Sequence, residues 1–368
     1  MRKKINFKAI SVGCIFFSAL VFLFSFVNNM YTAEMLLGEV VPAFEPYRSA
    51  LSAPPQAVAN AGDTIVSLLE DGGVIGLSTV VFEEYHANYE DIQTVLDTRI
   101  LSPFDVEALR DPDRLRTTMY TVDPRTAFLP EMFDIDRFLA KDMRIDYQNR
   151  AVGLPQVLIF HTHSTEFFVD SYTGDKFSGI VGVGHYLAQL LNGMGINTIH
   201  LTDRFDFIDG QSHIMGAYER QVPRINEVLA ANPSIEIVID MHRDGLPEGT
   251  PPLVTYIDGR RTAQIMFFNG LSLLNDGGIP TPIAHLPNPY IPYNLAFSFQ
   301  MQLAANQLFP GFTRRIYLHA FRYSLHFRPR SLLLEIGAQN NTFEEAINAM
   351  YPLAEVLAAV LAPHNETP

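Results

Sequence analysis

Three apolar runs in this chain each end in polar side chains that can bind a metal ion or transfer a proton. They are residues 157–160 followed by HTHSTE at 161–166, residues 235–239 followed by DMH at 240–242, and residues 332–334 followed by Glu335. Short apolar runs are typical of buried strands in an α/β sheet, which exposes its reactive groups where the strands end. We therefore expect the three polar groups to meet at one edge of a sheet.

From residue 156 onward, apolar runs alternate with stretches of helical spacing. The expected strands are 156–160, 197–201, 236–240, 264–269 and 332–336. The expected helices are 183–194, 217–231 and 343–361. This alternation predicts an α/β fold in which a doubly wound, twisted sheet is flanked by helices.

The turn after the first run is expected to supply metal ligands. His163 and Glu166 form an H-x-x-E pair that can converge on one ion from a turn, whereas within a strand the two side chains would point to opposite faces. His242 is expected as the third ligand, with Asp240 two residues earlier placed to orient its imidazole. Two imidazoles and one carboxylate suffice to hold a catalytic zinc ion with one position left for water.

Two nearby residues have roles that the sequence leaves open. His161 lies two residues before His163, and in an extended segment both would share a side. It is therefore an alternative to His163 as a ligand, a support for a ligand, or a contact to substrate. Arg243 either binds substrate or forms an ion pair with Asp244.

Glu335 is expected to be the catalytic base. It ends a run too apolar to carry a carboxylate without a reason, and burying an unpaired carboxylate is costly. Glu335 is therefore either paired, with Arg330 as the candidate partner, or held in the site with a raised pKa. In the second case it can deprotonate a water molecule activated by zinc.

The amino-terminal residues predict a membrane anchor. Basic residues in the first eight positions precede an uncharged stretch from Ala9 to Val27. As a helix this stretch spans roughly 28 Å, which matches a bilayer's hydrocarbon layer. The positive flank predicts that the amino terminus stays in the cytoplasm and the rest is exported, and a cleaved signal peptide is the alternative. Because the single cysteine, Cys14, lies in this stretch, the exported part has no thiol ligand.

We expect four regions along the chain. They are a cytoplasmic tip and anchor over 1–30, a spacer over 31–64, a small helical or docking region over 65–150, and a zinc hydrolase domain over 151–368. Residues 43–60 are rich in Pro and Ala, which suits an extended spacer. Residues 134–142 show the most regular helical pattern in the third region.

The charge balance argues against one class of partner. The chain has a formal net charge of −14 and no stripe of Lys and Arg residues. Binding to phosphates needs clustered cations. A nucleic-acid partner is therefore not expected.

At these residues the chain resembles the stage II sporulation protein P family, membrane-anchored peptidoglycan hydrolases of spore-forming bacteria. The matching segments are VLIFHTHSTEFF at 157–168, VIDMHRDG at 238–245 and RSLLLEIGAQNNTFEEA at 330–346, with a weaker match in LRTTMYTVDPRT at 115–126. The resemblance covers most of the chain beyond about residue 100.

The resemblance implies a fold like that of zinc N-acetylmuramoyl-L-alanine amidases and carboxypeptidases. It implies that His163, Glu166 and His242 hold zinc and that Glu335 is the catalytic carboxylate. It also implies cleavage of the amide between N-acetylmuramic acid and L-alanine, with an additional ability to cut peptide crosslinks. A partner enzyme that cleaves glycan strands, and a setting in engulfment of the forespore, are implied in the same way.

Two alternatives differ from the amidase. A zinc endopeptidase or carboxypeptidase would act on stem peptides, and a basic pocket involving Arg243 would favour it. A wall-binding scaffold would keep the fold without activity. Zinc content and sensitivity to a chelator distinguish the scaffold from an enzyme.

Overall fold

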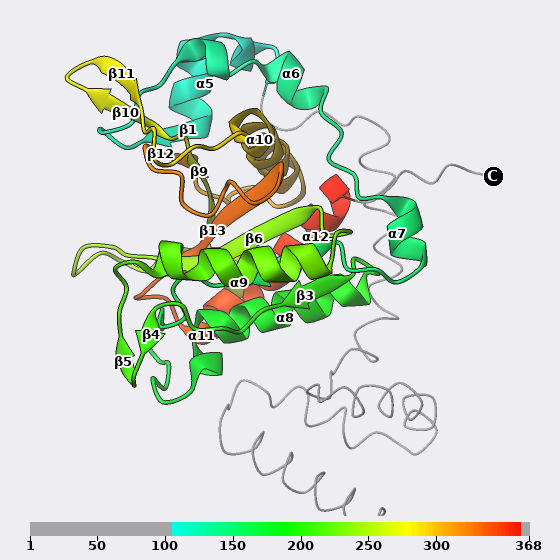
Figure 1. Ribbon diagram of the computed structural model, residues 1–368. Coiled ribbons are helices and arrows are strands. Elements are labelled where there is room, and N and C mark those ends of the chain that lie inside the picture. Colours follow the sequence, from blue (N-terminus) through cyan, green and yellow to red (C-terminus); the bar gives the residue numbers. More distant parts are fainter. Residues whose placement is uncertain (1–104, 362–368) are drawn as a thin grey trace, which may run out of the picture. The chain divides into compact units, whose positions relative to one another are not determined.

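A seven-stranded, mostly parallel sheet organises residues 105–361, the part of the chain that this computed structural model describes (Figure 1). Its strands are β1 (Tyr120–Val122), β2 (Val157–Phe160), β3 (Thr198–His200), β6 (Ile237–Asp244), β9 (Ile265–Gly270), β12 (Ile316–His319) and β13 (Arg330–Ala338). The order across the sheet is β1-β12-β9-β13-β6-β2-β3, and only β9 and β13 pair in antiparallel fashion. The predicted α/β class is confirmed, and each expected strand is found.

Three hairpins lie outside the main sheet. They are β4 (Phe207–Ile208) with β5 (Gln211–Ser212), β7 (Val254–Ile257) with β8 (Arg260–Ala263), and β10 (Leu273–Asp276) with β11 (Ile279–Pro282). The first two turn on Asp-Gly pairs at 209–210 and 258–259, in which both residues have positive φ. Asp-Gly is favoured there because a two-residue type I′ turn needs positive φ at both central positions.

The helices surround the sheet. They are α5 (Pro112–Met119), α6 (Ile135–Leu139), α7 (Tyr147–Ala151), α8 (Ile180–Gly193), α9 (Ala217–Ala231), α10 (Ile291–Leu308), α11 (Phe343–Asn348) and α12 (Met350–Leu361), with 3₁₀ turns η2 (Ala108–Arg110), η3 (Pro130–Met132) and η4 (Lys176–Ser178). The helix expected over 217–231 matches α9, and the one over 183–194 begins earlier, at Ile180. The helix expected over 343–361 is two helices, because Pro352 has no N–H to donate to the Asn348 carbonyl.

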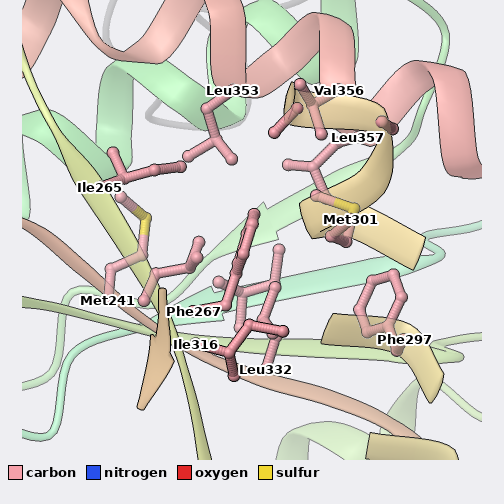
Figure 2. Packing of buried hydrophobic residues seen from close by; sticks show 14 of the residues in the cluster. Met241, Ile265, Phe267, Phe297, Met301, Ile316, Leu332, Leu353, Val356 and Leu357 are labelled. Carbon is pink, nitrogen blue, oxygen red and sulfur yellow. The ribbon is translucent and has the colours of Figure 1, made fainter. Parts of the chain in front are cut away.

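The two faces of the sheet are covered differently. One face packs on α8, α10 and α12, and Figure 2 shows Met241, Phe267 and Leu332 of the strands meeting Met301 and Leu357 of the helices. On the other face, α9 lies over β2 and β6, while β9 and β13 carry only a small apolar cluster. Because side chains alternate along a strand, the even-numbered residues of β6 and the odd-numbered residues of β13 point to this second face.

Residues 105–150 share the core of the sheet. Strand β1 pairs with β12 at the sheet edge. Leu115, Met119 and Phe138 are buried in the same apolar cluster as the central strands. The described part of the region expected over 65–150 holds one short strand besides its helices, and its helix α6 is shorter than the predicted 134–142.

The predicted anchor and spacer lie outside the described residues. Within residues 105–361, no helix is both long enough and apolar enough to cross a bilayer. The chain segment that was expected to do so, residues 9–27, precedes this range.

We predict that Gly184→Ala destabilises the fold. A methyl group on Gly184 of α8 would lie 2.5 Å from Cε1 and 2.6 Å from Nε2 of the buried His161 ring. Overpacking of this kind costs about 1–3 kcal/mol, which outweighs the roughly 1 kcal/mol that alanine gains over glycine in a helix. Urea unfolding should show a lower midpoint.

The matched control is Gly245→Ala, where a new methyl group meets no atom within 4 Å. Its midpoint should stay at that of the original protein. An unchanged midpoint for Gly184→Ala would mean that the His161 ring moves aside without cost.

Candidate metal centre

Two buried carboxylates fix the turn that follows β2. Asp240 accepts hydrogen bonds from the backbone N–H of Thr162 at 2.9 Å and from its hydroxyl at 2.6 Å. Asp206 accepts from the Ser164 hydroxyl at 2.6 Å and from the backbone N–H of Thr165 at 2.9 Å. Both carboxylates are fully buried, so these bonds replace the water that they lose. The turn is therefore held rigidly where it leaves the sheet.

His163, Glu166 and His242 come together at this turn. The Nδ1 atoms of His163 and His242 lie 3.1 Å and 3.3 Å from the same Glu166 oxygen, Oε1. The two imidazole rings are nearly perpendicular, with centres 5.0 Å apart. One ligand atom of each residue lies within 4.8 Å of the other two. The His163 and Glu166 side chains are 18% and 16% exposed, so the group is open to solvent on one side.

The donor set of this group fits zinc. Two imidazoles and one carboxylate form a common set of protein ligands in catalytic zinc sites. On the other side of His242, Nε2 lies 2.9 Å from Asp240 Oδ1, although the angle does not form a hydrogen bond. The second Glu166 oxygen accepts a hydrogen bond from the Arg243 backbone N–H at 2.8 Å. Carboxylates and backbone groups behind metal ligands usually orient them in this way.

Electrostatics also favours a cation here. Burial works against the charged form of His242, but the carboxylates of Asp240 and Glu166 raise its pKa well above the ordinary value. Burial likewise opposes ionisation of Glu166, yet His242 and His163 lower the pKa of Glu166 to about 2. The two carboxylates thus require a positive charge beside them, and a metal ion supplies it as well as a proton does.

Glu335 stands next to His242 across the sheet. The two residues are paired in register between the parallel strands β13 and β6, so their side chains share one face. Glu335 Oε2 is buried and makes no hydrogen bond within residues 105–361. Burial raises the pKa of Glu335 to about 8, and Glu166 adds to the shift. The alternative partner, Arg330, bonds Glu236 and backbone carbonyls instead.

His161 is buried on the opposite face of the sheet. Its Nδ1 lies 3.0 Å from the Met241 carbonyl oxygen and its Nε2 lies 2.8 Å from His200 Nε2. Because a carbonyl only accepts, Nδ1 carries the proton, and the neutral ring accepts at Nε2 from His200. Burial lowers the pKa of His161 to about 4, which keeps the ring neutral at physiological pH.

The two imidazoles of the HTH segment therefore do not share a side. The chain leaves the sheet after Phe160 and turns, which brings His163 and not His161 to Glu166. His161 is fully buried and has no exposed atom for a substrate to contact.

The Arg243 side chain closes the turn onto β6. Its guanidinium donates to the carbonyl oxygens of Phe167 at 2.8 Å and Asp244 at 3.1 Å. The Asp244 carboxylate pairs with Arg314 at 2.8 Å rather than with Arg243. The guanidinium of Arg243 and the carboxylate of Asp244 thus both bond to other groups of the protein.

Tyr218 is a site residue that the sequence did not reveal. It lies at the start of α9, with its ring edge-on to His163 at 5.4 Å and stacked on His242 at 6.3 Å. Burial raises the pKa of Tyr218 well above its ordinary value, so its hydroxyl remains a hydrogen-bond donor. No motif surrounds it, and only the packing of α9 against β6 brings it here.

Comparison with known proteins identifies the family to which this chain belongs. A profile of the stage II sporulation protein P (SpoIIP) family matches residues 134–358, more than half of the chain. The chain belongs to this family. It is similar to stage II sporulation protein P of Bacillus subtilis (strain 168), with 23% identity over 217 residues, which are 55% of this chain and 50% of that protein. The chain thus matches about half the length of this relative.

Solved structures show more distant similarity. The CwlD amidase of Clostridioides difficile, solved with the GerS lipoprotein, gives a TM-score of 0.34 at 9% identity and covers 55% of this chain and 96% of its own. The catalytic domain of CwlV, an N-acetylmuramoyl-L-alanine amidase from Bacillus(Paenibacillus) polymyxa var. colistinus, gives 0.32 at 12%, covering 56% and 97%. Cell shape determinant protein Csd4 of Helicobacter pylori gives 0.29 at 12%, covering 60% and 54%. At these scores the similarity carries no argument about chemistry.

We predict that the protein binds about one zinc ion per chain through three residues. Replacing His163, Glu166 or His242 by alanine removes a ligand, and each change should lower the zinc content of the purified protein to near zero. Elemental analysis after dialysis measures it. His213→Ala changes an exposed histidine outside the group and should retain zinc. Full zinc content in any of the three variants would contradict the assignment of that ligand.

We predict that Glu335 makes the metal-free protein less stable as pH rises. Its pKa is raised from 4.5 to about 8 in the folded state. Between these values the folded protein binds more protons than the unfolded chain, so stability falls with increasing pH by at most about 1.4 kcal/mol per unit. Urea unfolding with a chelator should show a shallower decline for Glu335→Gln than for the original protein. Parallel curves would refute the raised pKa.

Proposed function

We propose that this protein is a zinc-dependent peptidoglycan hydrolase that cleaves the amide between N-acetylmuramic acid and L-alanine. The observation that supports it best is the meeting of His163, Glu166 and His242 beside Glu335, whose Oε2 atom is buried and has no hydrogen-bond partner within residues 105–361. Membership of the stage II sporulation protein P family supports a role in sporulation. The choice of the muramoyl amide rests on the family resemblance.

The residues of the site have separate roles in the proposed hydrolysis. His163, Glu166 and His242 hold the metal, and Asp240 keeps His242 in place. When bound, zinc supplies a Lewis acid that acidifies water and polarises a carbonyl group. Glu335 accepts the proton of the attacking water and then delivers it to the amino group of the departing L-alanine. Burial raises the pKa of Glu335 and a bound cation would lower it again, which suits a carboxylate that both accepts and returns a proton.

The peptidase alternative was expected to be favoured by a basic pocket that involves Arg243. Two of the guanidinium nitrogens of Arg243 donate to the backbone carbonyls of Phe167 and Asp244, so this residue gives that alternative little support. Cleavage of crosslinks in addition to the amide remains part of the proposal. Mass spectrometry of digested sacculi separates the activities, because an amidase releases intact peptides and leaves saccharides bare of peptide.

Location and partners belong to the same proposal. Residues 9–27 would anchor the chain in the cell membrane as a single span, with the hydrolase domain outside the cytoplasm. Peptidoglycan is then within reach during engulfment of the forespore, and an enzyme that cleaves glycan strands would act beside it. Protease treatment of protoplasts tests the orientation, because only an external domain is digested.

We predict that Glu335→Gln abolishes activity without loss of zinc. Glutamine keeps the shape of the side chain but cannot accept the proton, and loss of a general base costs about 10²- to 10⁴-fold in rate. The rate of peptide release from purified sacculi and the zinc content are both measured.

The matched control is Glu344→Gln, which changes an exposed glutamate on α11 and should leave the rate unaltered. Activity of Glu335→Gln within tenfold of the original protein would remove Glu335 from the mechanism. An original protein that holds zinc but leaves sacculi intact would favour the scaffold alternative.

A further inference from the structure

A row of aromatic rings leads away from the metal group. Successive ring centres are 6.3 Å apart for His242 and Tyr218, 5.2 Å for Tyr218 and Tyr323, 5.2 Å for Tyr323 and His319, and 5.4 Å for His319 and Phe321. The row follows the face of the sheet that carries Glu335, beyond the part that α9 covers. Rings beside a hydrolytic site offer apolar contact area to a substrate.

Arg125 lies at the far end of this row. Its guanidinium carbon is 6.0 Å from the centre of the Phe321 ring, and both side chains reach solvent, with Arg125 61% and Phe321 38% exposed. Cations placed over a ring face in this way are attracted to it. The guanidinium therefore lies on the accessible side of the row.

Asp123 holds the guanidinium in one orientation. Arg125 Nε donates to Oδ1 at 3.0 Å and Nη2 to Oδ2 at 3.3 Å, while the Tyr317 hydroxyl donates to Oδ2 at 3.2 Å. Nη2 also lies 2.7 Å from His319 Nε2. Nη1 has no hydrogen-bond partner within residues 105–361. An arginine fixed on one edge and free on the other is prepared to bind a carboxylate.

The backbone around His319, Phe321 and Tyr323 is closely packed. Tyr323 has φ +54°, an uncommon conformation for a bulky residue. At the end of β9, a methyl group on Gly270 would lie 2.1 Å from the Phe321 carbonyl oxygen. Tyr323 packs with Leu333 on the face of the sheet that carries Glu335. The row of rings that starts at His242, next to Glu335, thus ends at Arg125.

We propose that Arg125 and Phe321 form a subsite for a free carboxylate of the stem peptide, with Tyr218 and Tyr323 lining the path to the metal group. This rests on the proposed function and names the part of the substrate that this surface binds. A glycan strand at the scissile position carries no free carboxylate, because its lactyl group is already part of the amide. The intervening rings place Arg125 away from the scissile bond, as binding of a residue further along the peptide requires.

The test compares two muropeptides that differ only in whether the stem carboxylates are free or amidated. In Arg125→Gln, the ratio of kcat/KM for the free form to that for the amidated form should fall about tenfold, mainly through KM. A charge-assisted hydrogen bond contributes enough to produce such a change. Arg137→Gln removes an exposed arginine paired with Asp134 and should leave the ratio unchanged.

Binding gives a second measurement that does not depend on turnover. Calorimetry with the Glu335→Gln protein should show tighter binding of the free-carboxylate peptide than of the amidated one, and adding Arg125→Gln should remove the difference. An equal fall in kcat/KM for both substrates, or no fall, would overturn the proposed subsite. If the original protein cleaves neither substrate, the proposed function fails, whereas the binding difference still decides whether Arg125 selects a carboxylate.

Discussion

The buried carboxylate of Asp240 is the interaction on which the rest of the site depends. It accepts hydrogen bonds from Thr162 after β2 and from the Ser324 hydroxyl at 2.7 Å, and it faces His242 on its own strand. A buried charge is tolerated only where such partners replace water. One side chain therefore connects the turn of the candidate ligands His163 and Glu166, the strand of the third candidate ligand, and the segment next to Tyr323.

The alternation of side chains along β6 and β13 determines which polar side chains lie together. Met241 and Leu334 pack into the helix-covered core, so Asp240, His242 and Glu335 necessarily share the other face. That face is covered by α9 only over β2 and β6, and the site lies where this cover ends. The metal group therefore borders solvent through His163 and Glu166, while Glu335 Oε2 stays buried beside it.

Strand positions and the polar residues at their ends could be predicted from the sequence, because apolar runs with abrupt polar ends carry both signals. The face of the sheet on which His161 lies could not be predicted, because it depends on where the chain leaves the sheet. Strands β1 and β12 were not predicted, although β3 and β2 are just as short and were predicted. Helix α10 is mostly buried and shows no amphipathic period, so the sequence did not reveal it. Tyr218 reaches the site only through tertiary packing.

The charges of the site couple metal binding to the state of the proposed base. Asp240 and Glu166 surround His242 with negative charge, and Glu166 also raises the pKa of Glu335. A cation held by Glu166 offsets that repulsion and lowers the pKa of Glu335, so that the carboxylate ionises more readily when the metal is present. By the same linkage, ionised Glu335 strengthens the attraction for the cation. The unpaired carboxylate, which is unfavourable in the metal-free protein, would thereby help to hold a bound cation.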